Sequence, residues 1–152
     1  MSLPHVNTFR DLIVYGRARE LQRSIFGLPK KFPKVENHSL TDQIRRSSRS
    51  AGAQIAESWA KRRYEKHFIS KLTDAIGELN ETEHWIETAE ESEYIDTAQM
   101  NDPLNIAAEA RLMLSSMISK SDKFCTQSGT IVRESDIEDF LIPMAPKAIL
   151  HY

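Results

Sequence analysis

The sequence predicts an all-α protein: an antiparallel up-and-down four-helix bundle followed by an irregular C-terminal tail. Four segments of similar length carry apolar residues at helical spacing, and short connections join them, which is typical of such bundles. The chain of 152 residues contains five Gly and six Pro, and no Pro lies between Pro33 and Pro103. This long Pro-free stretch favours helices over a turn-rich β protein. We expect the bundle to span residues 1–128 and the tail to span residues 129–152.

The first helix is predicted to begin at Asn7 or Thr8, either of which can cap it, and to end at Gly27. A rotation of 100° per residue places a set of its apolar residues on one side, which we expect to face the core. These residues are Val14, Ala18, Leu21 and Ile25.

The second helix is predicted to be capped by Ser39 or Thr41 and to end at a short break over residues 61–65. Two of its core positions, Ser48 and Ala51, are small, so the neighbouring helices must come close at the middle of the bundle. The full core side is Leu40, Ile44, Ser48, Ala51, Ile55 and Trp59.

The third and fourth helices complete the bundle. Asp102 followed by Pro103 is typical of an N-cap and a first-turn proline, so the fourth helix is predicted to begin there and to end before Gly129. The core side of the third helix is Phe68, Leu72, Ala75, Leu79, Thr82, Ile86 and Ala89. The core side of the fourth is Ile106, Ala110, Met113, Met117, Ser121 and Phe124.

The tail is too apolar to be purely solvated, yet its two prolines prevent a long helix. We expect it to pack on its own bundle or on a neighbouring subunit rather than to remain disordered. The apolar residues that suggest this are Ile137, Phe140, Leu141 and Ile142.

Charge is divided unevenly along the chain. Residues 1–71 contain 15 Lys or Arg and 6 Asp or Glu, whereas residues 72–152 contain 5 and 16. This asymmetry has two interpretations. The two halves pair with each other, within the fold or between subunits, or the basic half forms a face that binds phosphate backbones.

The second helix carries small residues between arginines on a face beside its core side, whereas a solvated face normally carries long polar side chains throughout. Three interpretations compete: a subunit interface, a nucleic-acid contact and an ordinary solvated face. The predicted interface residues are Gly52, Ala53, Ala56, Ala60 and, as an aromatic anchor on the third helix, Trp85. The predicted nucleic-acid-binding residues are Arg45, Arg46, Arg49, Lys61, Arg62, Arg63 and Lys66, with Tyr64 as an aromatic among them.

Motifs of catalysis and metal binding have little support. Glu81 and His84 have the Glu-x-x-His spacing of di-iron bundles, but such sites need two copies and only one is present. The dinucleotide, P-loop and paired-cysteine motifs are missing. Cys125, the single cysteine, is interpreted as a packed thiol in a reducing cytoplasm. We therefore expect no catalytic residues, no metal and no cofactor.

No secretory signal and no apolar run of transmembrane length is visible in the sequence. A cytoplasmic protein with no membrane partner is therefore expected.

Several motifs together resemble a known family. They are Phe9-Arg-Asp-Leu12 with Tyr15, Lys31-Phe32-Pro33 with Glu36, and Gln43-Ile-Arg-Arg-Ser-Ser-Arg-Ser50 followed by Ile55-Ala56-Glu57. On these residues, and over about residues 9–125, the chain resembles the four-helix-bundle proteins encoded within intervening sequences of bacterial 23S ribosomal RNA. It departs from them at Gln54, where Asn is usual, and at Ser58, where Gly is usual.

The resemblance implies an up-and-down bundle that assembles into a ring, a homopentamer, with a link to nucleic acid. Similar bundles serve as accessory subunits of reverse transcriptases in diversity-generating retroelements. With the residue patterns, this leads us to expect a non-enzymatic homo-oligomer that binds RNA or DNA through its basic surface. The alternative is a protein–protein adaptor or scaffold that docks a protein partner and makes no nucleic-acid contact.

Overall fold

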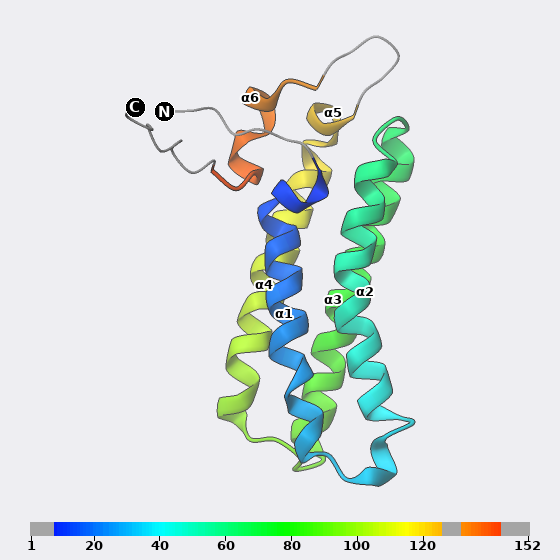
Figure 1. The fold of residues 1–152 in the computed structure, drawn as a ribbon, viewed down its shortest axis with the longest axis vertical. Helices are drawn as coiled ribbons and strands as arrows, with labels where there is room; N and C mark the ends of the chain where they lie inside the picture. The colour runs from blue at the N-terminus through cyan, green and yellow to red at the C-terminus, as the bar shows by residue number, and fades with distance from the viewer. Residues whose placement is uncertain (1–7, 126–131, 144–152) are drawn as a thin grey trace, which may run out of the picture.

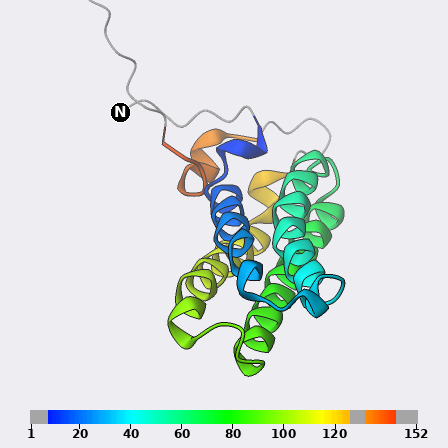
Figure 2. The ribbon, with the colours of Figure 1, turned by 60° about the horizontal axis from the view of Figure 1, so that its bottom comes forward.

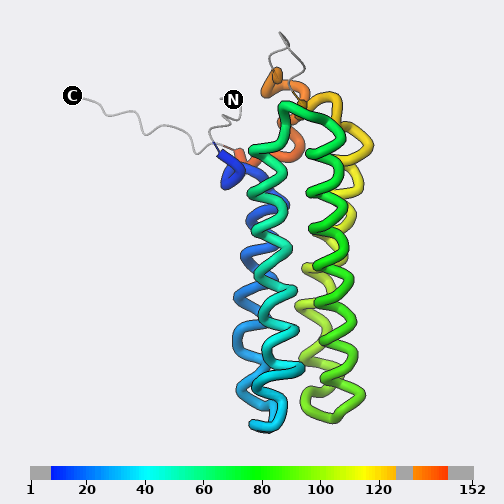
Figure 3. The backbone as a smooth tube through the Cα atoms, turned by 90° about the vertical axis from the view of Figure 1, so that its right-hand side faces the viewer, coloured from blue at the N-terminus to red at the C-terminus, as the bar shows by residue number. Residues whose placement is uncertain are grey.

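Four long helices run up and down the molecule (Figure 1). They are α1 (Ile13–Phe26), α2 (Leu40–Ala60), α3 (Glu65–Glu91) and α4 (Thr97–Ser119). The computed structural model describes residues 8–125 and 132–143 of the chain. Successive helices are antiparallel, α2 and α3 make the most extensive contact, and α4 closes the bundle against α1 (Figures 2 and 3). The predicted all-α four-helix bundle is thereby confirmed.

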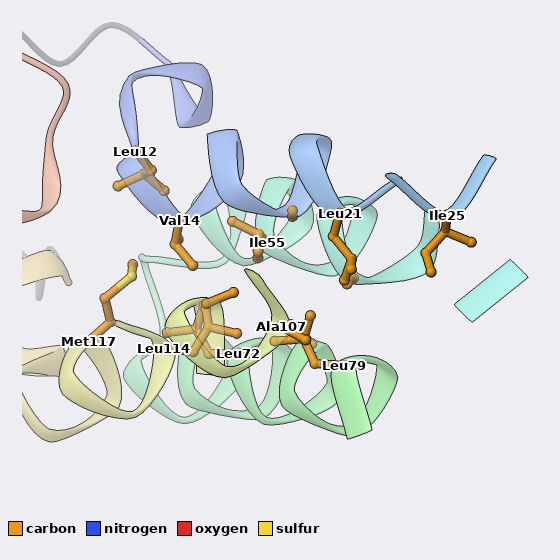
Figure 4. Packing of buried hydrophobic residues seen from close by; sticks show 14 of the residues in the cluster. Leu12, Val14, Leu21, Ile25, Ile55, Leu72, Leu79, Ala107, Leu114 and Met117 are labelled. Carbon is orange, nitrogen blue, oxygen red and sulfur yellow. The ribbon is translucent and has the colours of Figure 1, made fainter. Parts of the chain in front are cut away.

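The core consists of apolar side chains that all four helices direct inward. In Figure 4, Val14 and Leu21 of α1 and Ile55 of α2 face Leu72 and Leu114 across the interior. Every residue predicted for the core sides of α1, α2 and α3 is buried. Removing this apolar surface from water is the main driving force for bundle formation.

Two hydroxyl groups meet inside the bundle, between α2 and α3. The Oγ1 atom of Thr82 lies 2.9 Å from the Oγ of Ser47 and 2.8 Å from the carbonyl oxygen of Glu78. Both residues are fully buried, so this contact satisfies polar groups that would otherwise destabilise the core. Ser58, which departs from the family pattern, is also buried, and its hydroxyl donates to the carbonyl of Ile55 at 2.6 Å.

The prediction for the start of α4 is wrong by six residues. Asp96 is the N-cap: its carboxylate accepts from the Gln99 N–H at 2.8 Å, and the Gln99 side chain accepts from the Asp96 N–H at 2.9 Å. Pro103 therefore lies inside the helix, where it is buried. Of the core residues predicted for this helix, Ala110, Met117, Ser121 and Phe124 are buried, whereas Ile106 and Met113 are half-buried. The buried residues of α4 are Pro103, Ala107, Ala110, Leu114 and Met117.

The connections at one end of the bundle close each helix with a specific contact. After α1, two 3-10 turns follow, η2 (Leu28–Lys31) and η3 (Lys34–Glu36). The Glu36 carboxylate then accepts from the Leu40 N–H at 3.1 Å, so a residue of η3 satisfies the start of α2 in place of the Ser39 or Thr41 side chain. At the same end, α3 leads into α4 through a turn in which Glu93 has φ 63°.

The first turn of the described chain is separate from α1. The 3-10 turn η1 (Phe9–Asp11) is capped by Thr8, and Leu12 then adopts an extended backbone before α1 begins at Ile13. The reason for this interruption is a contact with the other end of the chain. Leu12 forms an antiparallel bridge with Leu141, and the Ile142 N–H donates to the Asp11 carbonyl at 2.8 Å. Asn7, the other predicted cap, lies outside the described residues.

The described part of the C-terminal tail covers one end of the bundle. The short helix α5 (Ser121–Phe124) follows α4, and α6 (Glu134–Ile137) and η4 (Glu138–Phe140) lie over it and beside η1 (Figure 1). Ile137 and Leu141 are buried, and the Phe140 ring meets the Phe124 ring edge-on at 5.1 Å. Residues 132–143 thus pack on their own bundle, whereas residues 129–131 and 144–152 of the predicted tail lie outside the described ranges.

Candidate nucleic-acid interface and subunit contacts

The seven predicted nucleic-acid-binding residues do not form one patch. Arg45, Arg46 and Arg49 lie near the start of α2, whereas the other four lie at its end and in the turn before α3. An α-helix rises 1.5 Å per residue, so Arg45 and Lys61 are separated by about 24 Å along the axis. The structure therefore divides the prediction into an α2 group and a turn group, which have different environments.

Arg46 forms its ion pairs within the chain. Its guanidinium forms an ion pair with the Glu81 carboxylate and a second one with Glu78 at 3.4 Å, both on α3. The hydrogen bond from Arg46 lowers the pKa of Glu81 below its usual value, and a further hydrogen bond from the Trp85 indole adds to this effect. Two carboxylates thus neutralise Arg46, which weakens its candidacy as a phosphate ligand.

Arg45 and Arg49 remain without an ion pair in the described part of the chain. The Arg45 guanidinium lies 5.7 Å from the centre of the Phe26 ring on α1, and its Nε is buried without a hydrogen-bond partner among the described residues. Both arginines line an open groove of about 620 Å³ on the outside of α2. The other residues that line this groove are Asp42, Gln43, Arg46, Ser50 and Ala53.

A further arginine of α1, which was not predicted from the sequence, belongs to the same side of the molecule. Arg19 is exposed, and helical rotation puts it beside Tyr15 and Phe26. Arg23 is also exposed, but it lines a groove toward α4 with Asp102 and Glu109. Tyr15 and Phe26 mark the side of α1 that faces α2, through contacts at Gly52 and Arg45. The α1–α2 hairpin therefore carries a basic face. The signal in the sequence was the four-residue spacing of Tyr15 and Arg19.

The α2–α3 turn carries the second basic group at the opposite end of α2. Arg62 packs its guanidinium 3.5 Å from the centre of the Trp59 indole and donates from Nε to the Trp59 carbonyl at 2.9 Å. Burial lowers its pKa from the ordinary value. The two contacts with Trp59 hold this arginine against the end of α2. Arg63 and Lys66 are exposed and Lys61 is half-buried, and none of the three forms an ion pair with a described residue.

Tyr64 lies in the middle of this turn and is 59% exposed. Its ring contacts the imidazole of His67 with the centres 5.4 Å apart. Tyr64 is also the N-cap of α3, and its side chain makes no capping hydrogen bond. The positive end of the α3 dipole is thus adjacent to the cations of the turn, and the arrangement suits an anionic ligand.

The predicted subunit-interface residues have different locations. Gly52 is buried against α1, where an added Cβ would lie at an ordinary contact distance, 3.7 Å, from the Ala18 Cβ, so this position packs within the chain and not on the outer surface. Ala53 and Ala60 are exposed, and Ala56 is half-buried. Trp85 is half-buried, and its indole donates to the Glu81 carboxylate at 3.2 Å. The interface prediction is corrected for Gly52, and the other four remain available at the surface.

Carboxylates gather on the α3–α4 hairpin, on the other side of the bundle from the basic face. At the end of the bundle where α2 begins, the end of α3 and the start of α4 carry acidic side chains that form no ion pair with described residues. Some opposite charges of the two hairpins nevertheless pair within the chain, since Arg17 of α1 forms an ion pair with Glu109 of α4 at 3.2 Å. The unpaired acidic residues are Glu87, Glu90, Glu91, Glu93 and Asp102.

The described residues also bear on the other kinds of site. Across residues 8–125 and 132–143, no group of three or more His, Cys, Asp or Glu side chains could hold a metal ion. None of the described helices is both long and apolar enough to cross a membrane. Cys125 is buried, and burial raises the pKa of its thiol to about 11, so the thiol is protonated at neutral pH and a weak nucleophile.

Comparisons with known proteins agree with this architecture. The 23S rRNA-intervening sequence protein family matches residues 10–116, which include all four long helices except the last residues of α4. The chain is also similar to a Bacteroides thetaiotaomicron protein of unknown function from the S23 ribosomal protein family. The two are 33% identical, the match covers 70% of this chain and 98% of that one, and the TM-score is 0.61. No curated protein matches. On the family match, the chain belongs to the 23S rRNA-intervening sequence protein family.

Proposed function

We propose that the protein is a non-enzymatic, cytoplasmic homo-oligomer, assembled as a pentameric ring, that binds RNA or DNA through its α2–α3 turn. The proposal of nucleic-acid binding rests on one observation. Lys61, Arg63 and Lys66 lie together at one end of the bundle without acidic partners among the described residues. Cations that are not neutralised within the fold can bind phosphates and release the counterions that surround them.

The turn also has the rigidity that a binding site needs. The Lys61 N–H donates to the Ser58 carbonyl and the Tyr64 N–H donates to the Lys61 carbonyl, both at 3.0 Å. Arg62, held against Trp59, anchors the turn to the end of α2. A cluster fixed in this way loses less conformational entropy when a ligand binds than lysines on a flexible loop would lose.

Charge complementarity supports the ring. The basic face of the α1–α2 hairpin and the acidic side of the α3–α4 hairpin are two different surfaces of one subunit, so a contact between them is head-to-tail. Head-to-tail contacts close into rings when the rotation between subunits allows it. Exposed Ala53 and Ala60 leave room for a neighbouring helix to approach α2. In a ring, the α2–α3 turns of all subunits would lie on the same side, which would multiply their positive potential.

The test is the affinity of the protein for a labelled RNA of about 20 nucleotides, measured by fluorescence anisotropy over a range of salt concentrations. We expect binding that weakens as salt rises. The triple variant Lys61→Ala, Arg63→Ala, Lys66→Ala should bind much more weakly, and the slope of log K against log salt should fall by about 2 for a single strand.

The matched control is the triple variant Lys30→Ala, Lys31→Ala, Lys34→Ala. It removes the same charge from the opposite end of the bundle, so it should retain most of the affinity. Equal losses in the two variants would show that net charge, and not the turn, attracts the RNA. No binding of the unmodified protein at low salt would contradict the nucleic-acid proposal and favour the protein–protein adaptor.

A further inference from the structure

We infer that the α2–α3 turn recognises single-stranded nucleic acid, with one unpaired base stacked on the ring of Tyr64. The inference rests on the proposed function, because it names the kind of nucleic acid that the turn would bind. It is carried by an exposed aromatic ring that a fixed backbone holds among cations.

Tyr64 is held in place through its backbone. Its N–H donates to the Lys61 carbonyl, and its own carbonyl accepts from the N–H groups of His67 and Phe68, all at 3.0 Å. Phe68 is fully buried in the core, so these bonds connect the turn to a rigid part of the bundle. The phenol side chain itself projects from this support and is 59% exposed.

The surroundings distinguish Tyr64 from Phe26, the other exposed Phe, Tyr or Trp among the described residues. Phe26 is 54% exposed, but it lies at the opposite end of the bundle from the α2–α3 turn (Figure 1), with the Arg45 guanidinium 5.7 Å from its ring centre. Tyr64 instead has Lys61 and Arg63 before it and Lys66 after it in the chain, with His67 against its ring at 5.4 Å. An aromatic platform among phosphate-binding cations is the arrangement that binds single strands with little sequence preference.

A duplex cannot use this platform in the same way. Its bases are already stacked on each other, so the turn would contact only its phosphates, and the Tyr64 ring would gain no stacking partner. A single strand can turn one base out onto the ring. Base–aromatic stacking accounts for about 5- to 150-fold in affinity per base.

The experiment compares an oligouridine of about 12 nucleotides with a duplex of the same length at one salt concentration, using Tyr64→Ala and Tyr64→Phe. Tyr64→Ala should weaken binding of the single strand about 5- to 150-fold and leave binding of the duplex within about 2-fold. Tyr64→Phe, which keeps an aromatic ring, should retain the affinity for the single strand. Because the Tyr64 side chain makes no capping hydrogen bond, both variants should fold normally, which circular dichroism checks.

Val35→Ala is the control, since it removes another exposed apolar side chain, at the opposite end of the bundle, and should leave binding of the single strand unchanged. A direct assay is photo-crosslinking of 4-thiouridine RNA, in which we expect the crosslinked peptide to contain residue 64. If Tyr64→Ala binds both nucleic acids like the unmodified protein, the stacking inference is wrong while the proposed function stands. If the unmodified protein binds neither nucleic acid, the proposed function itself is wrong.

Discussion

Glu93 ends α3 with a backbone conformation that a side chain makes costly. Its φ of 63° is the only positive value at a non-glycine position among the described residues. The Tyr94 N–H donates to the Ala89 carbonyl and the Glu93 N–H donates to the Glu90 carbonyl, both at 2.9 Å. These two bonds form a Schellman motif, in which the position of Glu93 is usually occupied by Gly.

Glu93→Gly should therefore stabilise the protein by about 1 kcal/mol, because Gly adopts the left-handed conformation without a steric penalty. The loss of a carboxylate from the C-terminal end of a helix dipole adds to the gain. The measurement is urea denaturation followed by circular dichroism. Glu93→Ala is the control, since it removes the charge but keeps Cβ. It should give only the smaller, electrostatic part of the gain, and an equal gain would argue against backbone strain.

Individual side chains were the hardest to assign from sequence. Helical rotation indicates which side of α2 a residue occupies, but not which neighbouring helix or carboxylate that side meets. Arg46 was therefore grouped with Arg49, although Glu78 and Glu81, more than 30 residues away in the chain, neutralise it. Gly52 was assigned to the outer surface for the same reason, since only the packing of α1 reveals that Ala18 lies against it.

Helix boundaries depend on competition between local signals, and α4 is the clearest example. The pair Asp102–Pro103 is a good start signal, but Asp96 and Gln99 form a reciprocal capping box that begins six residues earlier. Pro103 is tolerated inside the helix at the cost of one backbone hydrogen bond, the one that its missing N–H would donate to Gln99. The earlier start extends the helix by the residues Thr97–Asp102.

Asp96→Ala should lower the free energy of unfolding by about 1 kcal/mol, since the capping hydrogen bond to the Gln99 N–H would be lost. Asp102→Ala should leave the stability unchanged or raise it slightly, because Asp102 is exposed inside the helix and Ala has the higher helix propensity. The pair is compared by thermal or urea denaturation. A larger loss for Asp102→Ala would place the start of α4 at the proline.

The regular elements were predictable where the apolar pattern was strong. The core sides of α1, α2 and α3 follow directly from residues spaced three and four apart, and all of those residues are buried. Irregular contacts outside the long helices were not predictable. Glu36, which caps α2 from a 3-10 turn, and Leu141, which interrupts the start of α1, act through contacts that no local pattern encodes.

The whole molecule has opposite charges on its two hairpins, and this property is visible both in the sequence and in the fold. The halves of the chain differ in sign, and the bundle topology assigns them to separate hairpins. What the sequence could not predict is which charges are already paired. Ion pairs such as that of Arg17 with Glu109 neutralise some of these charges within the subunit, whereas Arg45 and Arg49 form no ion pair with a described residue.

Native mass spectrometry should show pentamers of the unmodified protein, and the double variant Arg45→Glu, Arg49→Glu should dissociate into smaller species because like charges would then meet. A compensated variant that also carries Glu87→Lys and Glu90→Lys restores opposite charges at a head-to-tail contact, so it should recover assembly. A monomer of the unmodified protein at micromolar concentration would contradict the ring. If the Arg45→Glu, Arg49→Glu variant still formed pentamers without the compensating changes, a subunit contact between these two faces would be excluded.

The bridge between Leu12 and Leu141 also constrains the order of events during synthesis. The ribosome makes Leu12 near the beginning of translation, but its backbone partner is made 129 residues later. Until then the apolar side chain of Leu12, which is fully buried in the finished fold, is partly exposed to solvent. The α1–α2 hairpin can therefore form early, whereas the end of the bundle beside the α2–α3 turn is completed only when the C-terminal segment emerges.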